Sequence, residues 1–349
     1  MQDSSMSLPQ KDAYMTMIDN LISQYKNNIL HKCFNSYLSE NYREAESILL
    51  SQFPENSFNK DPMVQYLMGL LKYKLEEYKS ALNYFDNVLN LEINLKAIVY
   101  DNQGYGYLMQ KNYYLAEKNF KAACTSSQNN FHFHNHLAIF YKIIYSIEKE
   151  THKKIELEDS KSQNSKNFGG KYSSSKSVNS SDIESSDYEK EKLQKKIGKE
   201  INEASKASTN GTKIRNKYKS SFQEALNINP NSYISLLNLG TFFVEEGEIG
   251  QAEKYYKRAE MINKQTTGKK DWKIYINLAY LAFKEKEYPL SMGYFEILFK
   301  TFENKVDLKA LNVYMICLYQ NKEWKKLEKI TKKILKIDKK NKKALFYLI

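Results

Sequence analysis

The hydrophobic residues of this chain recur in a pattern that repeats about every 35 positions. In residues 62–95, an apolar segment contains one small residue, Gly69, and a polar turn follows at Glu76–Tyr78. Next come Ala81 and, four positions later, Phe85. Apolar residues spaced three to four positions apart on both sides of the turn are typical of amphipathic helices. This segment therefore predicts a helical hairpin.

Three further segments repeat the order of small residue, turn, small residue and aromatic: 97–130 (Gly104, Ala116, Phe120), 233–266 (Gly240, Ala252, Tyr256) and 272–307 (Ala279, Ser291, Phe295). Weaker units occupy residues 26–60 and 308–341. In the second of these, Met315 and Leu327 stand where small residues are expected. The small residues matter because the two helices of a hairpin cross there, and a larger side chain would push them apart.

One unit is interrupted by an insert. Residues 131–149 predict its first helix and residues 215–230 predict its second, with a segment rich in Ser, Lys, Asn and Glu between them. Such a composition cannot bury enough apolar surface to fold, so we expect disorder there, apart from a charged helix at 187–206. A long insert between two helices costs little, since loop-closure entropy grows slowly with length.

The repeated pattern resembles the tetratricopeptide repeat over roughly residues 26–341, apart from the insert. The resemblance implies an all-α superhelix, or solenoid, of about seven helical hairpins with a disordered insert in the fourth. The expected boundaries are a disordered N-terminus at 1–12, an N-terminal array at 13–149, the low-complexity insert at 150–212, and a C-terminal array with a basic last hairpin at 213–349.

The resemblance also implies a partner-binding groove that is formed by the first helix of each hairpin. The positions that match form an apolar, aromatic surface with spaced amides: Tyr66, Leu70, Tyr73, Asn102, Tyr105, Met109, Asn238, Thr241, Asn277, Tyr280, Phe283 and Tyr319. An Asn can both donate to and accept from an extended peptide backbone, whereas an apolar groove suits a partner helix or a hydrophobic peptide. A family subgroup that clamps the C-terminal tail of chaperones needs Lys and Asn where this chain has Tyr66 and Leu70, so we expect no such partner.

Lysine is concentrated near the end of the chain. The formal net charge is +12, and residues 321–343 contain eleven Lys against three acidic residues, which gives that segment a net charge of +8. These Lys alternate with Leu327, Ile330 and Ile334, a pattern that predicts an amphipathic helix with a basic outer face. A solvated face is the simpler interpretation. If the face binds, an acidic partner, RNA or an anionic lipid surface are the candidates.

The sequence contains no recognisable catalytic motif: it has no Gly-rich phosphate loop, no nucleophile elbow and no Cys pair at metal-binding spacing. We interpret Cys33, Cys124 and Cys317 as buried, inert thiols of a protein in a reducing compartment. His132 and His136 lie one helical turn apart without a third ligand nearby, so we expect no metal and no cofactor. There is no secretory signal and no apolar run of about 20 residues, which favours a cytoplasmic or nuclear location.

These observations predict a non-catalytic interaction scaffold, or an adaptor subunit of a multi-protein complex. Two alternatives stay open at this point: an RNA-binding helical repeat protein that uses the basic C-terminal face, and a regulatory subunit of an enzyme complex. Ser181 and Ser186 each have Glu three positions later, a pattern that suits an acidophilic kinase. Both are therefore candidate phosphorylation sites, where a phosphate would add about two negative charges.

Overall fold

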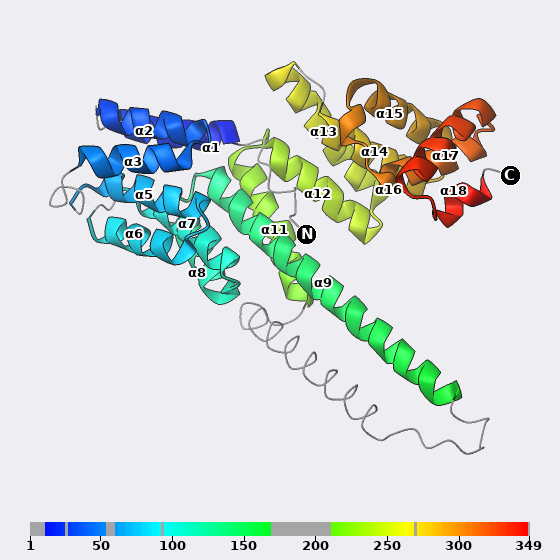
Figure 1. The fold of residues 1–349 in the computed structure, drawn as a ribbon, viewed down its shortest axis with the longest axis horizontal. Helices are drawn as coiled ribbons and strands as arrows, with labels where there is room; N and C mark the ends of the chain where they lie inside the picture. The colour runs from blue at the N-terminus through cyan, green and yellow to red at the C-terminus, as the bar shows by residue number, and fades with distance from the viewer. Residues whose placement is uncertain are drawn as a thin grey trace. The chain divides into compact units, whose positions relative to one another are not determined.

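The computed structural model describes residues 11–24, 27–53, 60–91, 94–168, 211–268 and 271–347. Every element in these ranges is helical, as the ribbon shows (Figure 1). The chain divides into two compact units, Met1–Ile228 (unit 1) and Asn229–Ile349 (unit 2). None of the described helices is both long and apolar enough to cross a bilayer. The expected all-α fold is confirmed.

Unit 1 begins with helix α1 (Lys11–Gln24) and continues as four hairpins. Their helices are α2 (Asn28–Leu38) with α3 (Tyr42–Gln52), α5 (Pro62–Lys74) with α6 (Tyr78–Leu91), α7 (Lys96–Met109) with α8 (Tyr113–Ser126), and α9 (Phe131–Phe168) with α11 (Gly211–Ile228). Each hairpin also packs against the next one along the chain, through α3 and α5, α6 and α7, and α8 and α9. This stacking is the arrangement expected of repeat units that cannot bury their apolar faces alone.

Unit 2 contains three further hairpins and a short final helix. They are α12 (Tyr233–Glu246) with α13 (Ile249–Thr267), α14 (Trp272–Lys284) with α15 (Tyr288–Thr301), and α16 (Leu308–Gln320) with α17 (Trp324–Ile337), followed by α18 (Lys342–Phe346). A 3₁₀ turn, η2 (Glu303–Lys305), links the second and third of these. The described residues of the two units form seven helix pairs, in line with the prediction of about seven from the sequence. The weak last unit forms a pair as well, with Met315 and Leu327 buried in its core.

The helices of a hairpin approach most closely at the small residues. A Cβ atom added at Gly69 would lie 2.4 Å from the ring of Phe85, and one added at Gly240 would lie 2.5 Å from the ring of Tyr256. Gly104 has the same relation to the aromatic residue of its own hairpin. Real Cβ atoms do not approach other atoms so closely, so glycine lets the aromatic ring lie flat against the facing helix. The sequence-based reason for the small residues is therefore confirmed.

The six hairpins whose connecting turns are described share one turn conformation. At the end of α5, Glu76 has a left-handed φ of 64°, its amide donates to the carbonyl of Tyr73, and the Glu77 amide donates to the carbonyl of Lys72. This pair of bonds satisfies carbonyl groups that the end of a helix leaves open. The left-handed residue recurs at Glu40, Lys111, Gly247, Lys286 and Lys322. The repeated turn gives each of these hairpins the same short connection.

The fourth hairpin differs from the sequence-based prediction in the length of its first helix. Helix α9 continues to Phe168, beyond the predicted end at residue 149 and into the expected insert. The segment after residue 149 is rich in Lys and Glu, which favour helix without needing a buried face. The charged helix expected at 187–206 and the candidate sites Ser181 and Ser186 lie outside the described residues, and the domain boundaries stay predictions.

Candidate partner-binding faces

In unit 2, the first helices α12, α14 and α16 carry the predicted groove positions. All six of these positions are partly or largely exposed: Asn238, Thr241, Asn277, Tyr280, Phe283 and Tyr319. Tyr319 has the most open side chain of the set, with an exposed fraction of 40%. We call these six residues the inner face of unit 2. It combines three aromatic rings with two amides and one hydroxyl and carries no charged group of its own.

Neighbouring rings and hydroxyls hold the inner-face side chains in place. The ring of Tyr280 meets that of Phe295 edge-on at 6.1 Å between centroids, and Lys309 Nζ lies 5.1 Å from the centre of the Tyr280 ring. Thr241 Oγ1 lies 3.1 Å from the hydroxyl of Tyr256. Burial raises the pKa of Tyr280 above its usual value, so its hydroxyl stays protonated and can donate a hydrogen bond. The face is thus largely formed before any partner arrives.

Two Asn residues of the first helices of unit 2 use their amide nitrogens within their own helices. The Nδ2 of Asn238 donates to the carbonyl of Ile234 at 2.9 Å, and the Nδ2 of Asn312 donates to the carbonyl of Leu308 at 2.9 Å. Within the described residues, Asn312 Oδ1 is buried and has no hydrogen-bond partner. Each of these amide nitrogens is therefore already engaged by a carbonyl of its own helix.

In unit 1, the prediction has to be corrected at two positions. The exposed fractions of Tyr66 and Leu70 are 0% and 4%, so neither side chain offers surface to a partner. Asn102 Nδ2 donates to the Tyr66 hydroxyl at 3.0 Å, and the Tyr66 ring packs on that of Phe85. The other four predicted positions of unit 1 remain accessible: Tyr73, Asn102 and Tyr105 are half-buried and Met109 is exposed.

Comparison with solved structures supports the assignment of the fold. PilF of Pseudomonas aeruginosa matches 82% of this chain over 96% of its own, with 11% identity and a TM-score of 0.52. PilW, a widely conserved type IV pilus biogenesis factor, matches 82% over 98%, with 12% identity and a TM-score of 0.50. A tetratricopeptide repeat protein from Parabacteroides merdae matches 92% over 96%, with 11% identity and a TM-score of 0.48. This chain has the tetratricopeptide-repeat fold. No protein-family model and no curated protein matches its sequence.

A buried polar contact in this tetratricopeptide array was not predicted. His136 Nδ1 lies 2.8 Å from Asp101 Oδ2, both side chains are buried, and the ring of Tyr105 packs edge-on against that of His136. Asp101 and His136 are 35 positions apart, which is one repeat, so the period could have indicated the pair. Within the described ranges, no three His, Cys, Asp or Glu side chains come together as metal ligands. His136 therefore joins two neighbouring hairpins.

A second buried contact ties the interrupted hairpin to its neighbour. Glu117 on α8 accepts hydrogen bonds from Lys217 on α11 at 2.9 Å and from Tyr141 on α9 at 2.8 Å. Burial disfavours the charged form of Glu117, but hydrogen bonds from Lys121, Lys217 and Tyr141 outweigh it and lower the pKa of the carboxyl. The carboxylate thus joins both helices of the fourth hairpin to the third, although the insert separates those helices in the sequence.

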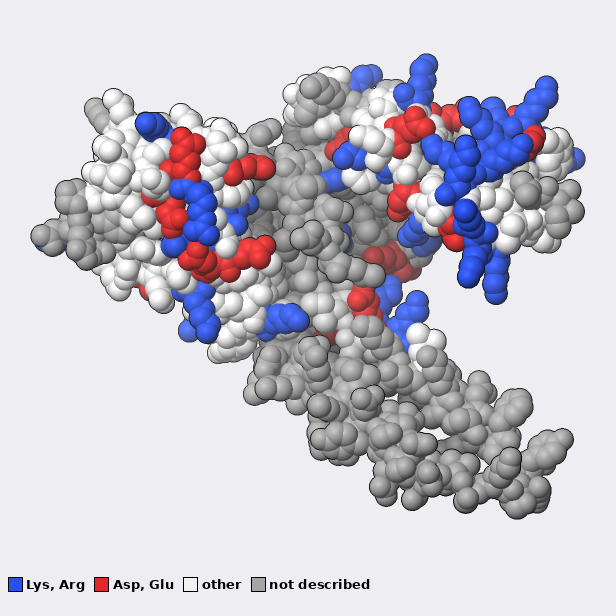
Figure 2. Space-filling view, viewed as in Figure 1, with Lys and Arg blue, Asp and Glu red and all other residues white. Residues whose placement is uncertain are grey.

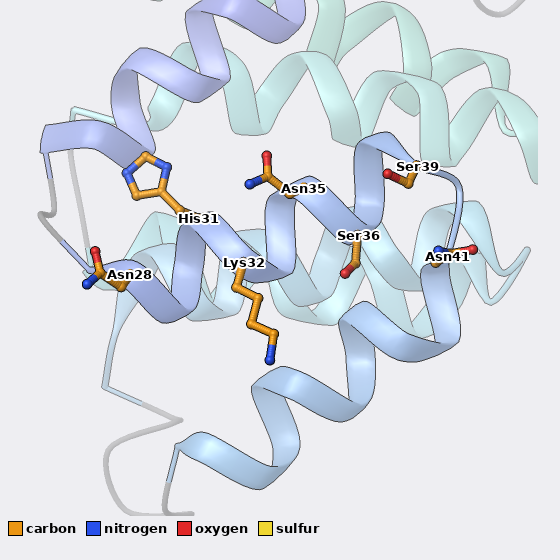
Figure 3. A pocket seen from close by; sticks show the side chains of 7 residues that line it. All are labelled: Asn28, His31, Lys32, Asn35, Ser36, Ser39 and Asn41. Atoms are coloured by element: carbon orange, nitrogen blue, oxygen red, sulfur yellow. The ribbon is translucent and has the colours of Figure 1, made fainter.

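A shallow polar pocket lies away from the predicted positions. It has a volume of about 410 Å³ and is lined by residues of α2 and the turn after it: Asn28, His31, Lys32, Asn35, Ser36, Ser39 and Asn41 (Figure 3). The side chains lie along one polar side of α2 and have few apolar neighbours in the pocket. A polar surface suits the first hairpin of a repeat array, which needs a soluble outer face.

The three cysteines occupy core positions, as the sequence predicts. All three are buried and unpaired by disulfide bonds. Burial raises the pKa of the thiols of Cys33 and Cys124 to about 12. A thiol with so high a pKa holds little thiolate near neutral pH, which makes it a poor nucleophile.

Proposed function

We propose that this chain is a non-catalytic scaffold that binds a protein partner along the inner face of unit 2. The observation that carries the proposal is the alignment of that face. On successive first helices, Asn238 and Asn277 stand at one repeat position and Phe283 and Tyr319 at another, and none of the six residues is buried. Aromatic rings supply large contact area at a low entropic cost, and they are enriched where protein partners bind.

The chemistry of the inner face supports a partner that is itself largely apolar. The six residues carry no charge, and Lys309 beside the Tyr280 ring is a single cation, which is too little to hold an acidic tail by charge alone. A hydrophobic peptide or one side of an amphipathic helix could cover Tyr280, Phe283 and Tyr319. The partner would gain hydrophobic contact area from the rings and orientation from the amides.

The proposal is tested by placing charges on the inner face. The variant Asn277→Lys with Tyr319→Glu adds one positive and one negative charge to that face and leaves the net charge unchanged. The matched control, Met261→Lys with Leu290→Glu, adds the same charges at exposed apolar positions of the second helices α13 and α15. Each tagged protein is purified from its source cells, and bound proteins are quantified by mass spectrometry.

We expect the inner-face variant to lose its principal partner by at least about tenfold, because burying an unpaired charge in an apolar interface costs several kcal/mol. The control should retain that partner, and both variants should keep the helical circular dichroism of the wild type. Equal retention of the partner by both folded variants, or equal loss from both, would refute binding at this face.

A further inference from the structure

The outer side of α17 carries a line of lysines. One side of this helix is buried in the core of unit 2, through Leu327, Ile330, Thr331 and Ile334. At 100° per residue, the opposite side is made by Lys325, Lys329, Lys332 and Lys336, and all four are exposed. We call these four residues the lysine stripe. With a rise of about 1.5 Å per residue, neighbouring members are about 4.5–6 Å apart along the helix and the stripe is about 16 Å long.

Ion pairs distinguish the stripe from the other lysines of α17. Lys326 pairs with Glu296 at 2.8 Å, and Lys333 pairs with Glu303 at 2.7 Å, so these two lysines connect α17 to the preceding hairpin and to η2. Within the stripe, only Lys332 has an ion pair in the described part of the chain, with Glu328 of the same helix at 2.6 Å. Such an exposed pair between flexible side chains is weak and is screened by salt. Within the described residues, the other three lysines of the stripe have no ion pair, although Lys329 lies near enough to Glu303 to lower the pKa of that carboxyl.

The surroundings of the stripe indicate the shape of its ligand. Carboxylates flank it, with Glu328 on one side and the partners of Lys326 and Lys333 on the other. Figure 2 shows Lys side chains gathered over α17 and α18, with smaller acidic areas beside them. A flat sheet of anionic headgroups would meet these carboxylates as well as the lysines, whereas a narrow, linear polyanion could follow the lysines alone.

The composition of the stripe indicates the chemistry of that polyanion. No apolar side chain lies between the four lysines, so a protein partner would lack the apolar core that a stable protein interface normally has. Nucleic-acid interfaces are more polar and much more positive, and most of their contacts go to phosphates. Exposed apolar side chains lie beyond both ends of the stripe, with Trp324 before it and Ile337, Leu345 and Phe346 after it.

We propose that the lysine stripe binds the sugar-phosphate backbone of a nucleic acid without reading its sequence. Successive phosphates of the strand lie along the row of ammonium groups, and binding releases the counterions that the strand had condensed. The site is separate from the inner face, because it lies on the second helix of the last hairpin rather than on the first helices. A strand and a protein partner could therefore be held at the same time.

The test compares four purified full-length proteins. The stripe variant changes Lys325, Lys329, Lys332 and Lys336 to Gln. The charge-matched control changes four exposed lysines elsewhere in unit 2 to Gln, namely Lys254, Lys264, Lys286 and Lys300. The fourth protein, Glu328→Gln, removes a flanking carboxylate. The probes are labelled single-stranded RNA and DNA of one mixed sequence, together with vesicles that contain phosphatidylserine, and binding is followed by fluorescence anisotropy and co-sedimentation.

At about 50 mM salt, the wild type and the control should bind the strands, while the stripe variant should bind at least about tenfold more weakly. The slope of log K against log salt should become shallower by about 3 in the stripe variant, since each single-strand phosphate contact contributes about 0.7. Glu328→Gln should bind more tightly than the wild type, which a folding defect could not produce. A preference between RNA and DNA would identify the natural strand.

Three results would overturn the proposal. The first is no strand binding by the wild type at low salt. The second is equal loss in the stripe variant and the control, which would indicate a general effect of net charge. The third is stripe-dependent binding to the vesicles without binding to either strand, which would assign the lysines to a membrane surface instead.

Discussion

At the scale of single residues, the hairpins depend on glycines that allow an aromatic ring to lie against the facing helix. We expect Gly69→Ala to lower the free energy of unfolding by about 1–3 kcal/mol, because its Cβ would lie 2.4 Å from Phe85. The matched variant Gly293→Ala lies within α15 with no atom within 4 Å of the added Cβ, so it should raise stability by up to about 1 kcal/mol. Urea denaturation measures both, and a loss of the same size in both variants would contradict the packing role of Gly69.

A second residue-scale prediction concerns pH. Burial lowers the pKa of His132 to about 4, and neighbouring His136 adds to the effect. Because this pKa is lower in the folded chain, the unfolded chain binds the proton more readily. The contribution of His132 to stability is therefore complete above the unfolded pKa of about 6.5 and is lost as the pH falls toward the folded value.

The matched variant for this prediction is His132→Gln. Between about pH 7 and pH 5, the wild type should lose about 1–2 kcal/mol more unfolding free energy than the variant, since other titrating groups are common to both. Urea denaturation at several pH values measures the difference. Parallel pH profiles for the two proteins would show that His132 does not titrate in this way.

Contacts between single residues also show which features the sequence can predict and which it cannot. The crossing glycines could be predicted because steric exclusion at a helix crossing is visible in the repeat itself. The burial of Tyr66 could not, because it depends on Asn102, which lies 36 positions away in the next hairpin. The position of Tyr66 within its repeat indicated an open face, but that position does not specify which side chains of neighbouring repeats cover it.

At the scale of elements, the turns between paired helices contain backbone strain that a substitution by glycine would remove. Five of the six described turns of this kind place a residue other than glycine at the left-handed position, with φ between 58° and 64°. In the folded chain, this conformation costs a residue with a Cβ about 1–2 kcal/mol, a cost that glycine avoids. Glycine in turn gives the unfolded chain more conformational entropy, which lowers stability by about 0.4–1 kcal/mol.

The net effect predicts that Lys286→Gly stabilises the chain by about 0.5–1 kcal/mol. The reverse change, Gly247→Ala, should destabilise it, because that glycine has a φ of 78° with open space around it. Thermal unfolding followed by circular dichroism compares the two. A lower melting temperature for Lys286→Gly would show that its side chain contributes more than the strain it causes.

The sequence predicts the length of a helix where a buried apolar face determines that length, and it does not predict the length elsewhere. The paired helices end where the apolar period ends, and the repeated turn reinforces that limit. Helix α9 runs on to Phe168 through a segment without such a period, where only intrinsic helix propensity acts. Nothing in the apolar pattern marks an end for a helix of that kind.

At the scale of the whole molecule, the two proposed surfaces use different elements. The inner face of unit 2 comes from the first helices α12, α14 and α16, and the lysine stripe comes from the second helix α17. Each can therefore be changed without altering the other. The sequence indicated the aromatic and basic character of these surfaces. It could not show which lysines of α17 form ion pairs, because that depends on where the carboxylates of α15 and η2 lie in the structure.

The central claim is that a protein partner lies along the first helices of unit 2. Hydrogen–deuterium exchange of the purified chain, measured with and without its co-purified protein partner, tests it most directly. Our account predicts slower exchange on binding in α12, α14 and α16 and little change in α13 and α15. Slower exchange confined to α13 and α15, or no change anywhere in unit 2 while the partner is bound, would contradict it.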